Sequence, residues 1–541
     1  LQVGSMYSRR VKWLLGGLAV LAALLLLFGL GGLLVAPTFI DRQVVKTDQL
    51  GLVDGPNGTR IPSDVTRKWM YPPYDMRLHV WLYSVTNEAA YLAGKEKIHL
   101  KEKGPYVFVE AQSKRDPSFS TDGLRVIYRN THQYFFNQSL SCKECRLTDQ
   151  ITIPNIIFQK LVDFAESSIA AKMAIESVLL LEKRETPFVT LTVGDALFEG
   201  YVDPILSKVC AFPVVSILCR AAKVPDRIGF FYGQNNTNDG AYEVGTGMSG
   251  PQDLGKMFAF NNSTTLPLTF WESPYARMIN GTDGQLFPPM LDKSKELTVF
   301  ASQACRSVRM AYQADSEYQG VSSWRYAPPS SMYDPAQPAN QIFCHFNDTV
   351  SYFDDPKVQL PGCLPSGMLD LSHCQPGNPR VYLSQAHFLQ SPKEVWQAVG
   401  GLSEPSEDND STYVDIEPTS GIPIWAKRVM QVNVGMKKGN LGVLDKTANV
   451  IVPVFWVNET ASFDEETRAQ LKDQLQAAKR AAFYGGLSSL CVGIAVAVGV
   501  VLAILVEWAF VAQGEGHERL ISETDEEGEY NVQEEEAGRD E

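Results

Sequence analysis

Few residues of this 541-residue chain have the types and spacing that catalysis requires. Gly250 to Lys256 has the spacing of a phosphate-binding loop, but Met257 stands where such a loop needs Ser or Thr to bind magnesium. No Gly-x-Ser-x-Gly nucleophile motif occurs, and the seven histidines lie singly, without a His-Glu-x-x-His motif. We interpret the glycine run as a surface loop. The motifs therefore predict no enzyme, no cofactor and no metal site.

Cysteine spacing indicates a different chemistry, the disulfide bond. Cys142 and Cys145 could form half of a zinc site, but no second Cys-x-x-Cys or His-x-x-x-His follows. An even set of cysteines in one long segment is typical of disulfides in an oxidising compartment. The set comprises Cys142, Cys145, Cys210, Cys219, Cys305, Cys344, Cys363 and Cys374, of which the first four allow three pairings. The ninth, Cys491, lies in an apolar run and is interpreted as a small apolar filler.

Glycosylation sequons occupy the same segment as the cysteines. Each is Asn-x-Ser/Thr, the acceptor for N-linked glycans in secreted or lumenal domains. They begin at Asn57, Asn137, Asn235, Asn261, Asn262, Asn280, Asn347, Asn409 and Asn458. Their confinement to one segment predicts that this segment is lumenal or extracellular.

Two uncharged runs flank that segment and predict membrane spans over residues 13–36 and 487–508. Each is long enough for the roughly 30 Å of a bilayer core, and the first exceeds the roughly 7–15 apolar residues of a cleaved signal peptide, which is the alternative. The predicted order is a cytosolic N-terminus (1–12), an ectodomain (37–486) and an acidic cytosolic tail (509–541).

Flanking charge supports this topology at one span only. Arg9, Arg10 and Lys12 before the first span predict a cytosolic N-terminus. Lys479 and Arg480 lie on the predicted outer side of the second span and oppose it weakly. The orientation therefore depends more on the sequons than on charge.

Within the ectodomain, strand patterns surround one helical region. Leu78, Val80 and Leu82 alternate with other residues at the period of a strand, and Gly104-Pro105 is interpreted as a turn. Helical composition over 155–183 falls within a predicted helical region, 151–222. Ser462 and Glu465 have the spacing of a capping box that begins a helix leading into the second span. The pattern predicts an α+β domain built on antiparallel sheet.

Several segments, in order along the chain, together resemble the class B scavenger receptor family. They are Val85-Thr86-Asn87, Glu102 to Phe108, Asn236 to Gly240, Met278 to Gly284, Phe287-Pro288-Pro289, Ala304 to Ser307, Asp415 to Pro418, Ala426-Lys427-Arg428 and Val452 to Glu459. The resemblance implies an irregular antiparallel β-barrel with an apical helical bundle, and an apolar tunnel that leads toward the bilayer. It also implies a receptor without catalytic residues, which passes lipid along the tunnel.

The resemblance carries over to single residues unevenly. It implies the disulfides Cys305–Cys374 and Cys344–Cys363, whereas Ala276 replaces a cysteine of the scavenger-type members, so the lysosomal-type pattern fits better. Basic residues of the helical region are the implied sites for anionic ligands: Lys160, Lys172, Lys183 and Arg184. The alternative for these four is a solvated charged helix face.

The implied partners are fatty acids, sterols, phospholipids or lipoprotein particles, or a lumenal or extracellular protein; a homo-oligomer is left open. Leu520-Ile521 in the tail resembles an acidic dileucine sorting signal, although Gly516 occupies the usual acidic position. The expected location is the cell membrane, with the lysosomal or endosomal membrane as the alternative. The alternative functions are a sorting receptor for a lumenal hydrolase and, more remotely, an ecto-nucleotidase or a ligand-gated channel.

Overall fold

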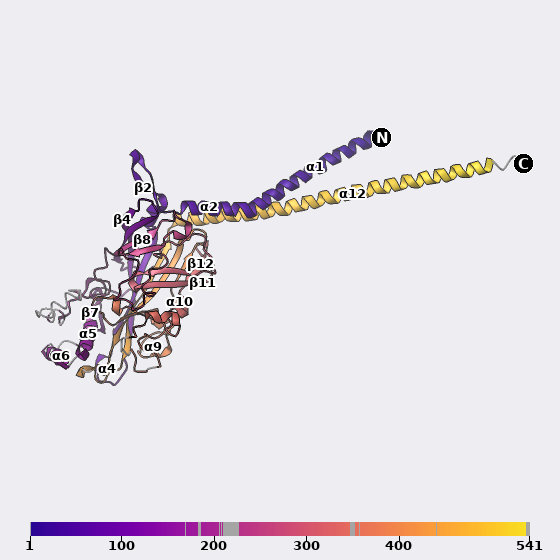
Figure 1. The fold of residues 1–541 in the computed structure, drawn as a ribbon. Coiled ribbons are helices and arrows are strands. Elements are labelled where there is room, and N and C mark those ends of the chain that lie inside the picture. Colours follow the sequence, from indigo (N-terminus) through magenta and orange to yellow (C-terminus); the bar gives the residue numbers. More distant parts are fainter. Residues whose placement is uncertain are drawn as a thin grey trace. The chain divides into compact units, whose positions relative to one another are not determined.

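The structure is a computed structural model that describes residues 2–167, 169–181, 186–204, 206, 208, 227–346, 352–355, 357–439 and 441–536. The chain divides into two compact units. One unit contains residues 1–43 and 472–541, and the other contains Val44–Leu471. Figure 1 shows the long terminal helices and the strand-rich unit along one ribbon.

A sheet of 13 strands forms the strand-rich unit. All the pairings within its main path are antiparallel, in the order β10-β11-β12-β15-β16-β17-β3-β4-β5-β8-β9, and β14 joins β13 to β16. The strands are β3 (Tyr74–Val85), β4 (Leu100–Phe119), β5 (Arg125–Phe136), β8 (Thr237–Gly245), β9 (Met257–Phe260), β10 (Leu297–Ala301), β11 (Arg306–Tyr318), β12 (Val321–Ala327), β13 (Met368–Asp370), β14 (Val381–Ser384), β15 (Tyr413–Ile416), β16 (Pro423–Met436) and β17 (Val450–Phe463).

The two ends of this strand path meet at one connecting segment. Met257 of β9 donates its backbone N–H to Gly281 O at 2.8 Å, and Phe300 of β10 donates to Thr282 O at 2.8 Å. Thr282 also donates to Thr298 O at 2.9 Å. The sheet is therefore a nearly closed antiparallel barrel, as the resemblance implied, and closure removes the open edges that would otherwise pair with another chain.

Strand β3 shows why the sequence pattern predicted sheet here. Leu78, Val80 and Leu82 are all at most 3% exposed, because alternate side chains of a strand point to the same face. The prediction of a turn at Gly104-Pro105 was wrong, since β4 runs through both residues. Gly104 lies against the Trp81 ring, where a Cβ atom would come within 2.6 Å, so glycine permits a close approach rather than a turn.

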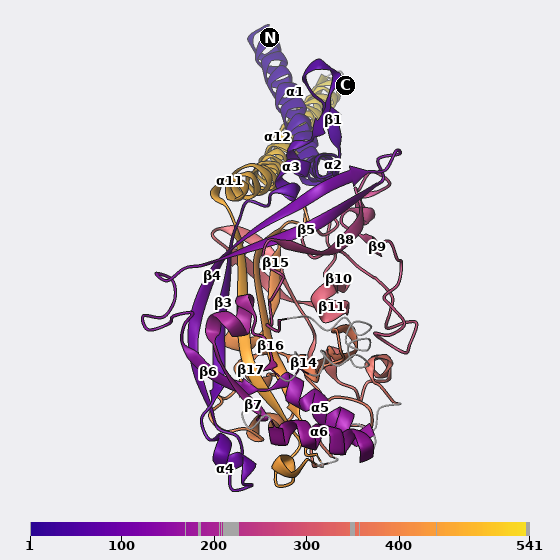
Figure 2. The same cartoon turned by 90° about the vertical axis from the view of Figure 1, so that its left-hand side faces the viewer.

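Two helices, α5 (Ile156–Ser167) and α6 (Ile169–Leu181), lie together at one end of the barrel unit (Figure 2). Asn155 caps α5, because its Oδ1 accepts the backbone N–H groups of Ile157 and Phe158. Phe158 and Val162 pack with Leu441 and Leu444 in the core beneath the helices. The smaller strands β6 (Gln150–Pro154) and β7 (Phe188–Thr192) pair beside them.

Helices α3 (Asp64–Met70) and α11 (Glu465–Ala469) lie at the opposite end of the barrel unit (Figure 2). The predicted capping box was wrong: Ser462 belongs to β17, where it pairs with Trp425 and Asp75. Asp464 caps α11 instead, and accepts the Thr467 N–H at 2.9 Å. The sheet pairing on both sides of β17 extends the strand beyond the predicted start of the helix.

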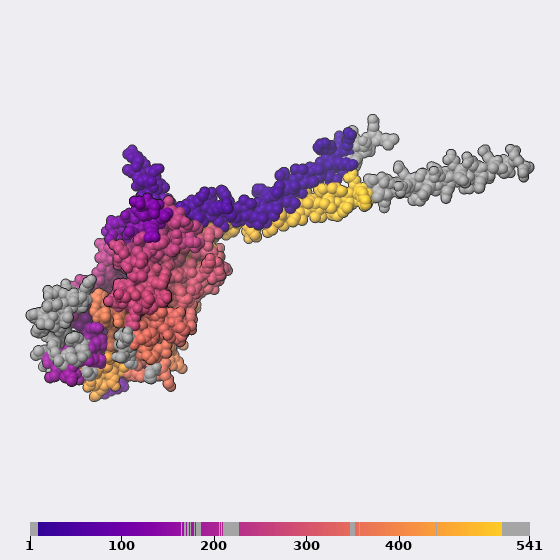
Figure 3. Space-filling view, viewed as in Figure 1, coloured from indigo at the N-terminus to yellow at the C-terminus, as the bar shows by residue number. Residues whose placement is uncertain are grey.

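The remaining elements of this unit are short. The hairpin of β1 (Leu52–Asp54) and β2 (Arg60–Pro62) projects from its surface (Figure 3). The other helices among the described residues are α4 (Glu88–Leu92), α9 (Lys393–Gln397) and α10 (Glu407–Asp410). Single helical turns are η2 (Pro56–Gly58), η3 (Asp195–Glu199), η4 (Pro251–Asp253), η5 (Ser302–Ala304), η6 (Ser330–Tyr333), η7 (Pro338–Phe343), η8 (Ser372–Cys374), η9 (Ala386–Phe388) and η10 (Gly442–Leu444).

The other unit is built from the two predicted spans. Helical segments Arg9–Thr47 and Glu465–Phe510 are the two, among the described residues, that are long and apolar enough to cross a membrane. The first segment runs through α1 (Gln2–Leu30), η1 (Gly31–Val35) and α2 (Ala36–Thr47). The second begins with α11, which belongs to the barrel unit, and continues through η11 (Gln470–Gln476) and α12 (Ala477–Glu536). Both helices extend beyond the predicted spans, because polar residues continue each helix past its apolar run.

Glycine brings the two membrane helices together. A Cβ on Gly32 would lie 2.9 Å from Gly486 Cα, and a Cβ on Gly29 would lie 2.8 Å from Leu490 N. Such small residues let helix backbones approach closely in lipid. Lys479 forms an ion pair with Asp41 at 2.7 Å, so one of the two charges that opposed the predicted topology is matched within the unit.

Candidate functional site

The barrel unit contains a cavity of about 460 Å³. This volume lies within the range of about 300–1,000 Å³ that is typical of small-molecule sites. Its lining is predominantly apolar and comes from strands around the barrel and from α3 and α11. Representative apolar lining residues are Val65, Trp69, Met76, Leu254, Leu286, Phe287, Val299, Phe300, Met310, Leu383, Val414, Ile422, Val429 and Met430.

One part of the lining is polar. Gln112 and Lys114 of β4, Asn130 and His132 of β5, and Glu459 of β17 line the cavity. Strands β17, β3, β4 and β5 are neighbours in the sheet, so these side chains come from one side of the barrel. The cavity can therefore accept an amphiphile, with apolar surface for a chain and polar groups for a head.

Lys114 is the most enclosed cation of this polar part, with 1% of the residue exposed. Its Nζ donates a hydrogen bond to Gln285 Oε1 and lies 5.0 Å from the Trp69 ring centroid and 5.6 Å from that of Tyr128. The two rings meet edge to face, with 4.8 Å between their centroids. A cation within about 6 Å of an aromatic face is attracted by the ring quadrupole.

Asp283 is the carboxylate whose charge raises the pKa of Lys114. Other groups donate hydrogen bonds to its two oxygens. Tyr128 Oη donates to Asp283 Oδ2 at 2.5 Å, and the Gln285 N–H donates to Asp283 Oδ1 at 2.9 Å. Burial lowers the pKa of Lys114 to about 8, and the charge of Asp283 opposes this effect only in part. Lys114 is therefore mostly a cation at neutral pH.

The neighbouring charges, in contrast, are paired. Arg428 forms an ion pair with Glu459, and His132 Nδ1 lies 2.6 Å from Glu110 Oε1. Burial raises the pKa of Glu110, with a further contribution from Glu459. Burial alone would lower the pKa of Arg428, but Glu459 outweighs it and the pKa is raised.

At the α3 end of the barrel unit, the cavity is lined by Asp48 and Lys68. Burial raises the pKa of Asp48 to about 7, and the charge of Glu417 adds to the effect. Lys68 Nζ lies 2.8 Å from Glu466 Oε1 and 3.7 Å from Asp64 Oδ2. Lys68 thus has carboxylate partners within the protein.

A second buried cation lies in the barrel unit, apart from the residues that line the cavity. His387 Nδ1 lies 3.0 Å from Asp410 Oδ1, and its Nε2 lies 3.5 Å from Glu102 Oε2. Burial alone would lower the pKa of His387, but these two carboxylates raise it to about 9. The Trp456 indole donates to Glu102 at 2.7 Å and stacks on Trp81, with 3.9 Å between centroids.

With this geometry established, comparison with known proteins identifies the family. The model of the CD36 family matches residues 20–504. The chain belongs to the CD36 family.

Two relatives show the breadth of the CD36 family. Lysosome membrane protein 2 of Rattus norvegicus is 30% identical over 456 residues, which cover 83% of this chain and 87% of that protein. Scavenger receptor class B member 1 of Rattus norvegicus is 27% identical over 479 residues, which cover 86% and 85% respectively. The resemblance to class B scavenger receptors is confirmed, and the chain is a scavenger-receptor-type membrane protein with two spans.

The disulfides of this CD36-family chain include both implied pairs. Cys305 bonds to Cys374 and Cys344 bonds to Cys363. Cys142 bonds to Cys145, which removes these two thiolates as zinc ligands. Cys210 and Cys219 lie outside the described residues.

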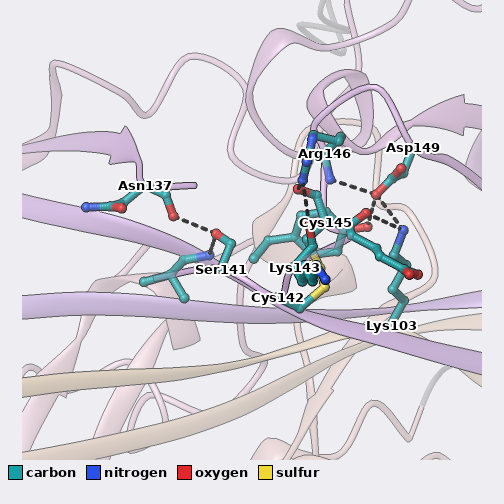
Figure 4. Close-up of a disulfide and its surroundings, with 11 residues drawn as sticks. Lys103, Asn137, Ser141, Cys142, Lys143, Cys145, Arg146 and Asp149 are labelled. Carbon is teal, nitrogen blue, oxygen red and sulfur yellow. Dashed lines mark hydrogen bonds and ion pairs between the residues drawn. A yellow bond between two sulfur atoms is a disulfide. The ribbon is translucent and has the colours of Figure 1, made fainter. Parts of the chain in front are cut away.

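The Cys142–Cys145 bond closes a small polar loop (Figure 4). Lys103 Nζ lies 2.7 Å from Asp149 Oδ2, and the Arg146 N–H donates to the same oxygen at 2.8 Å. This loop leads directly into β6 of the helical region, so the Lys103–Asp149 pair fastens that region to β4.

The four basic residues proposed for ligand binding are only partly described. Lys160 of α5 donates to Asn378 O at 3.0 Å, and Lys172 of α6 lies 3.8 Å from Glu176 on its own helix. Lys183 and Arg184 lie outside the described residues. Lys160 and Lys172 each have a partner within the protein, which is what a solvated charged helix face would also show.

The predicted modification and sorting residues fall in different surroundings. Six sequon asparagines are exposed: Asn57, Asn235, Asn261, Asn262, Asn280 and Asn409. Asn137 is half-buried, Asn347 lies outside the described residues, and Asn458 is half-buried in β17 with its Oδ1 enclosed. Leu520 and Ile521 lie in α12.

The sequence analysis missed the polar lining of the cavity, although β4 carries a signal for it. Tyr106, Phe108, Glu110, Gln112 and Lys114 alternate along the strand and so share one face. Glu110 and Lys114 are as buried as Tyr106 and Phe108. Polar residues at the inward positions of a barrel strand indicate a lined interior rather than a packed core.

Proposed function

We propose that this protein is a receptor that takes up lipid in the barrel cavity and passes it to the membrane in which its two spans lie. The cavity of about 460 Å³ carries the proposal, because its predominantly apolar lining suits a hydrocarbon chain. A lipid chain exposed to water costs roughly 0.8 kcal/mol per CH₂ group, and an apolar path removes that cost. Transfer of this kind involves no covalent step, which agrees with the absence of catalytic motifs in the sequence.

One end of the cavity supports this direction of transfer. Its lining includes Gln470, in the segment where the chain passes from β17 and α11 toward the second span. The residues that line this end of the cavity therefore lie close in the sequence to a membrane helix. The helical region at the opposite end of the unit, with α5 and α6, is the proposed docking site for lipid particles or a protein partner.

The proposal is tested by filling the cavity. Ala461 of β17 lines the cavity opposite Ala426 of β16 in the sheet register, whereas Ala111 of β4 is exposed and does not line it. We expect Ala461→Trp to reduce uptake of a fluorescent lipid from donor particles by cells that express the full chain, and Ala111→Trp to leave uptake unchanged. Normal uptake by Ala461→Trp at an equal surface level would refute the proposal.

The ligand-binding role of the helical region is tested separately. Replacing Lys183 and Arg184 with Glu should weaken the binding of anionic lipid particles if these residues attract them, and the same changes at Lys160 and Lys172 extend the test. Equal binding at low salt, where surface charge acts most strongly, would assign the four residues to a solvated helix face.

We propose the cell membrane as the main location, with the lysosomal or endosomal membrane as the alternative that the relationship to lysosome membrane protein 2 supports. Replacing both Leu520 and Ile521 with Ala should raise the surface fraction if the pair is a sorting signal. An unchanged distribution would remove the pair from consideration.

A further inference from the structure

A second, much smaller cavity of about 40 Å³ lies beside Arg306, the first residue of β11. Arg306 lines this cavity and not the large one, whereas Tyr333 and Leu369 line both and therefore belong to the wall between them. The rest of its lining includes Trp271, Asn340, Phe343, Asp370 and the Cys344–Cys363 disulfide.

Arg306 brings a buried positive charge to this cavity, since only 4% of the residue is exposed. Its Cζ atom lies 3.3 Å from the centroid of the Phe343 ring, which covers one face of the guanidinium group. The Nε atom is enclosed without a hydrogen-bond partner, and no other N–H of the guanidinium donates to a described residue. Burial lowers the pKa of Arg306 to about 10, so the group is still a cation at neutral pH.

Other arginines of the barrel unit have carboxylate partners. Arg380, which is 8% exposed, lies 2.5 Å from Asp163, and Arg309 of β11 lies 3.1 Å from Glu296. In the part of the chain that the structure describes, no carboxylate oxygen lies within 4.0 Å of the Arg306 guanidinium nitrogens. A buried charge without a partner is costly, so this position is suited to an anion from solution.

We propose that Arg306 binds a chloride ion in the small cavity. The volume selects a single-atom ligand, because a water molecule occupies about 30 Å³ in the liquid and the cavity offers about 40 Å³. Phosphate and sulfate have four oxygens and more than one negative charge, whereas Arg306 supplies one positive charge. The inference does not depend on the proposed transport of lipid.

The remaining polar groups of the lining are compatible with an anion. Burial raises the pKa of Tyr333, so its hydroxyl stays protonated and can donate a hydrogen bond. Asp370 is a carboxylate, but its Oδ1 accepts the Ser372 N–H at 2.7 Å, and its charge does not contribute to the pKa of Arg306. Asn340 already donates its amide to Ser331 O and Asp334 O.

The site would link segments that are distant in the sequence. Arg306 begins β11 directly after Cys305, Phe343 ends η7, and Asp370 ends β13. A chloride ion between them would neutralise the buried charge and stabilise this part of the barrel unit. We therefore expect the stability of the protein to depend on halide as well as on ionic strength.

The first experiment locates the ion directly. Crystals of the full chain are soaked in sodium bromide, because bromide replaces chloride and its anomalous scattering distinguishes it from water. We expect an anomalous peak in the small cavity beside the Arg306 guanidinium. A cavity that holds only water at saturating bromide would refute the proposal, and this result needs no variant.

The second experiment measures binding in solution. The Tm of the full chain in lipid nanodiscs is followed as sodium chloride replaces sodium gluconate at constant ionic strength. We expect a saturable rise in the wild type and in Arg309→Met, a matched control whose arginine already pairs with Glu296. In Arg306→Met, the chloride concentration for half of the effect should increase about tenfold to hundredfold, the range for a charged hydrogen bond.

Leu364→Phe provides a second variant, because Leu364 lines the small cavity and a larger side chain would fill it while Arg306 stays in place. It should weaken the response to chloride as Arg306→Met does, so a folding defect in either variant does not remove the test. An unchanged response in both variants would place the ion elsewhere. A wild-type Tm that is the same in chloride and gluconate would refute a stabilising chloride.

Discussion

Two buried cations of the same barrel unit, Lys114 and His387, have opposite electrostatic surroundings. His387 lies between Asp410 and Glu102, and their charges raise its pKa to about 9 despite burial. Lys114 lies between aromatic rings and an amide, and burial lowers its pKa to about 8. The protein therefore stabilises one positive charge by itself and leaves the other in need of a partner.

The difference separates a structural ion cluster from a binding position. The His387 cluster joins η9, α10 and β4, three segments that are distant in the sequence, and it does not line the cavity. Lys114 lines the cavity and, in the part of the chain that the structure describes, has no carboxylate oxygen within 4.0 Å. The following experiments test whether the two sites differ in this way.

The largest expected effect follows from replacing each cation with an apolar residue. His387→Leu leaves buried Asp410 uncompensated and should lower the free energy of unfolding by about 3–5 kcal/mol, whereas Lys114→Met should change it by less than about 1 kcal/mol. Thermal unfolding of the purified full chain, followed by tryptophan fluorescence, measures both. Equal losses of Tm would show that Lys114 is a structural counter-ion of Asp283.

The next effect is stabilisation by ligand. A fatty acid at a hundred times its Kd should stabilise the wild type by about 2.7 kcal/mol and raise its Tm. The increase should persist in Lys68→Met and largely disappear in Lys114→Met at the same concentration. A matching Tm increase in Lys114→Met would show that the charge of Lys114 does not contribute to binding of the acid.

The pH dependence of stability should differ in sign between the two sites. The stabilisation by His387 is complete below its usual pKa of 6.5 and is lost as the pH rises through about 9, because the native state binds the extra proton. Burial of Lys114 destabilises the native state below pH 8, and this penalty is relieved between about 8 and 10.5, because there the unfolded state binds more protons.

Each slope is at most about 1.4 kcal/mol per pH unit for one proton. It is measured as the Tm difference between the wild type and His387→Leu or Lys114→Met across the corresponding pH range. Asp283 faces Lys114, and Asp410 and Glu102 face His387. Slopes of the same sign would invalidate the comparison.

The smallest expected effect is that of Lys68→Met without ligand. Lys68 pairs with Glu466, whose side chain is 67% exposed, and such surface pairs contribute about 0.2–1 kcal/mol. Its Tm should therefore lie close to that of the wild type. A loss as large as that of His387→Leu would disqualify Lys68→Met as a control.

Local patterns predicted the architecture better than the interior. Alternation at Leu78, Val80 and Leu82 predicted β3, and uncharged runs predicted both membrane helices, because in each case a periodicity or a length is written into consecutive residues. The cap predicted at Ser462 failed because pairing with Asp75, far along the chain, overrode the local signal. The turn predicted at Gly104-Pro105 failed because β4 continues through both residues beside the neighbouring strand β3.

The candidate site could be predicted only in part, because it depends on contacts between distant segments. The alternation from Tyr106 to Lys114 could have revealed an inward-facing lysine. The positions of Trp69, Asp283 and Gln285 around it could not have been predicted, since closure of the barrel brings these residues together. The pairing of Cys142 with Cys145 likewise needed three-dimensional distances to select among three possibilities.

The glycine contact between the membrane helices has a consequence for how the barrel folds. The first residue of β3, Tyr74, pairs with the last residue of β17, Phe463. They are roughly 390 residues apart, and joining the ends of a flexible loop of that length costs about 5 kcal/mol in chain entropy. When Gly32 packs on Gly486 in the bilayer, the two ends of the chain are already held together. The membrane helices therefore reduce the chain entropy that is lost when Tyr74 pairs with Phe463.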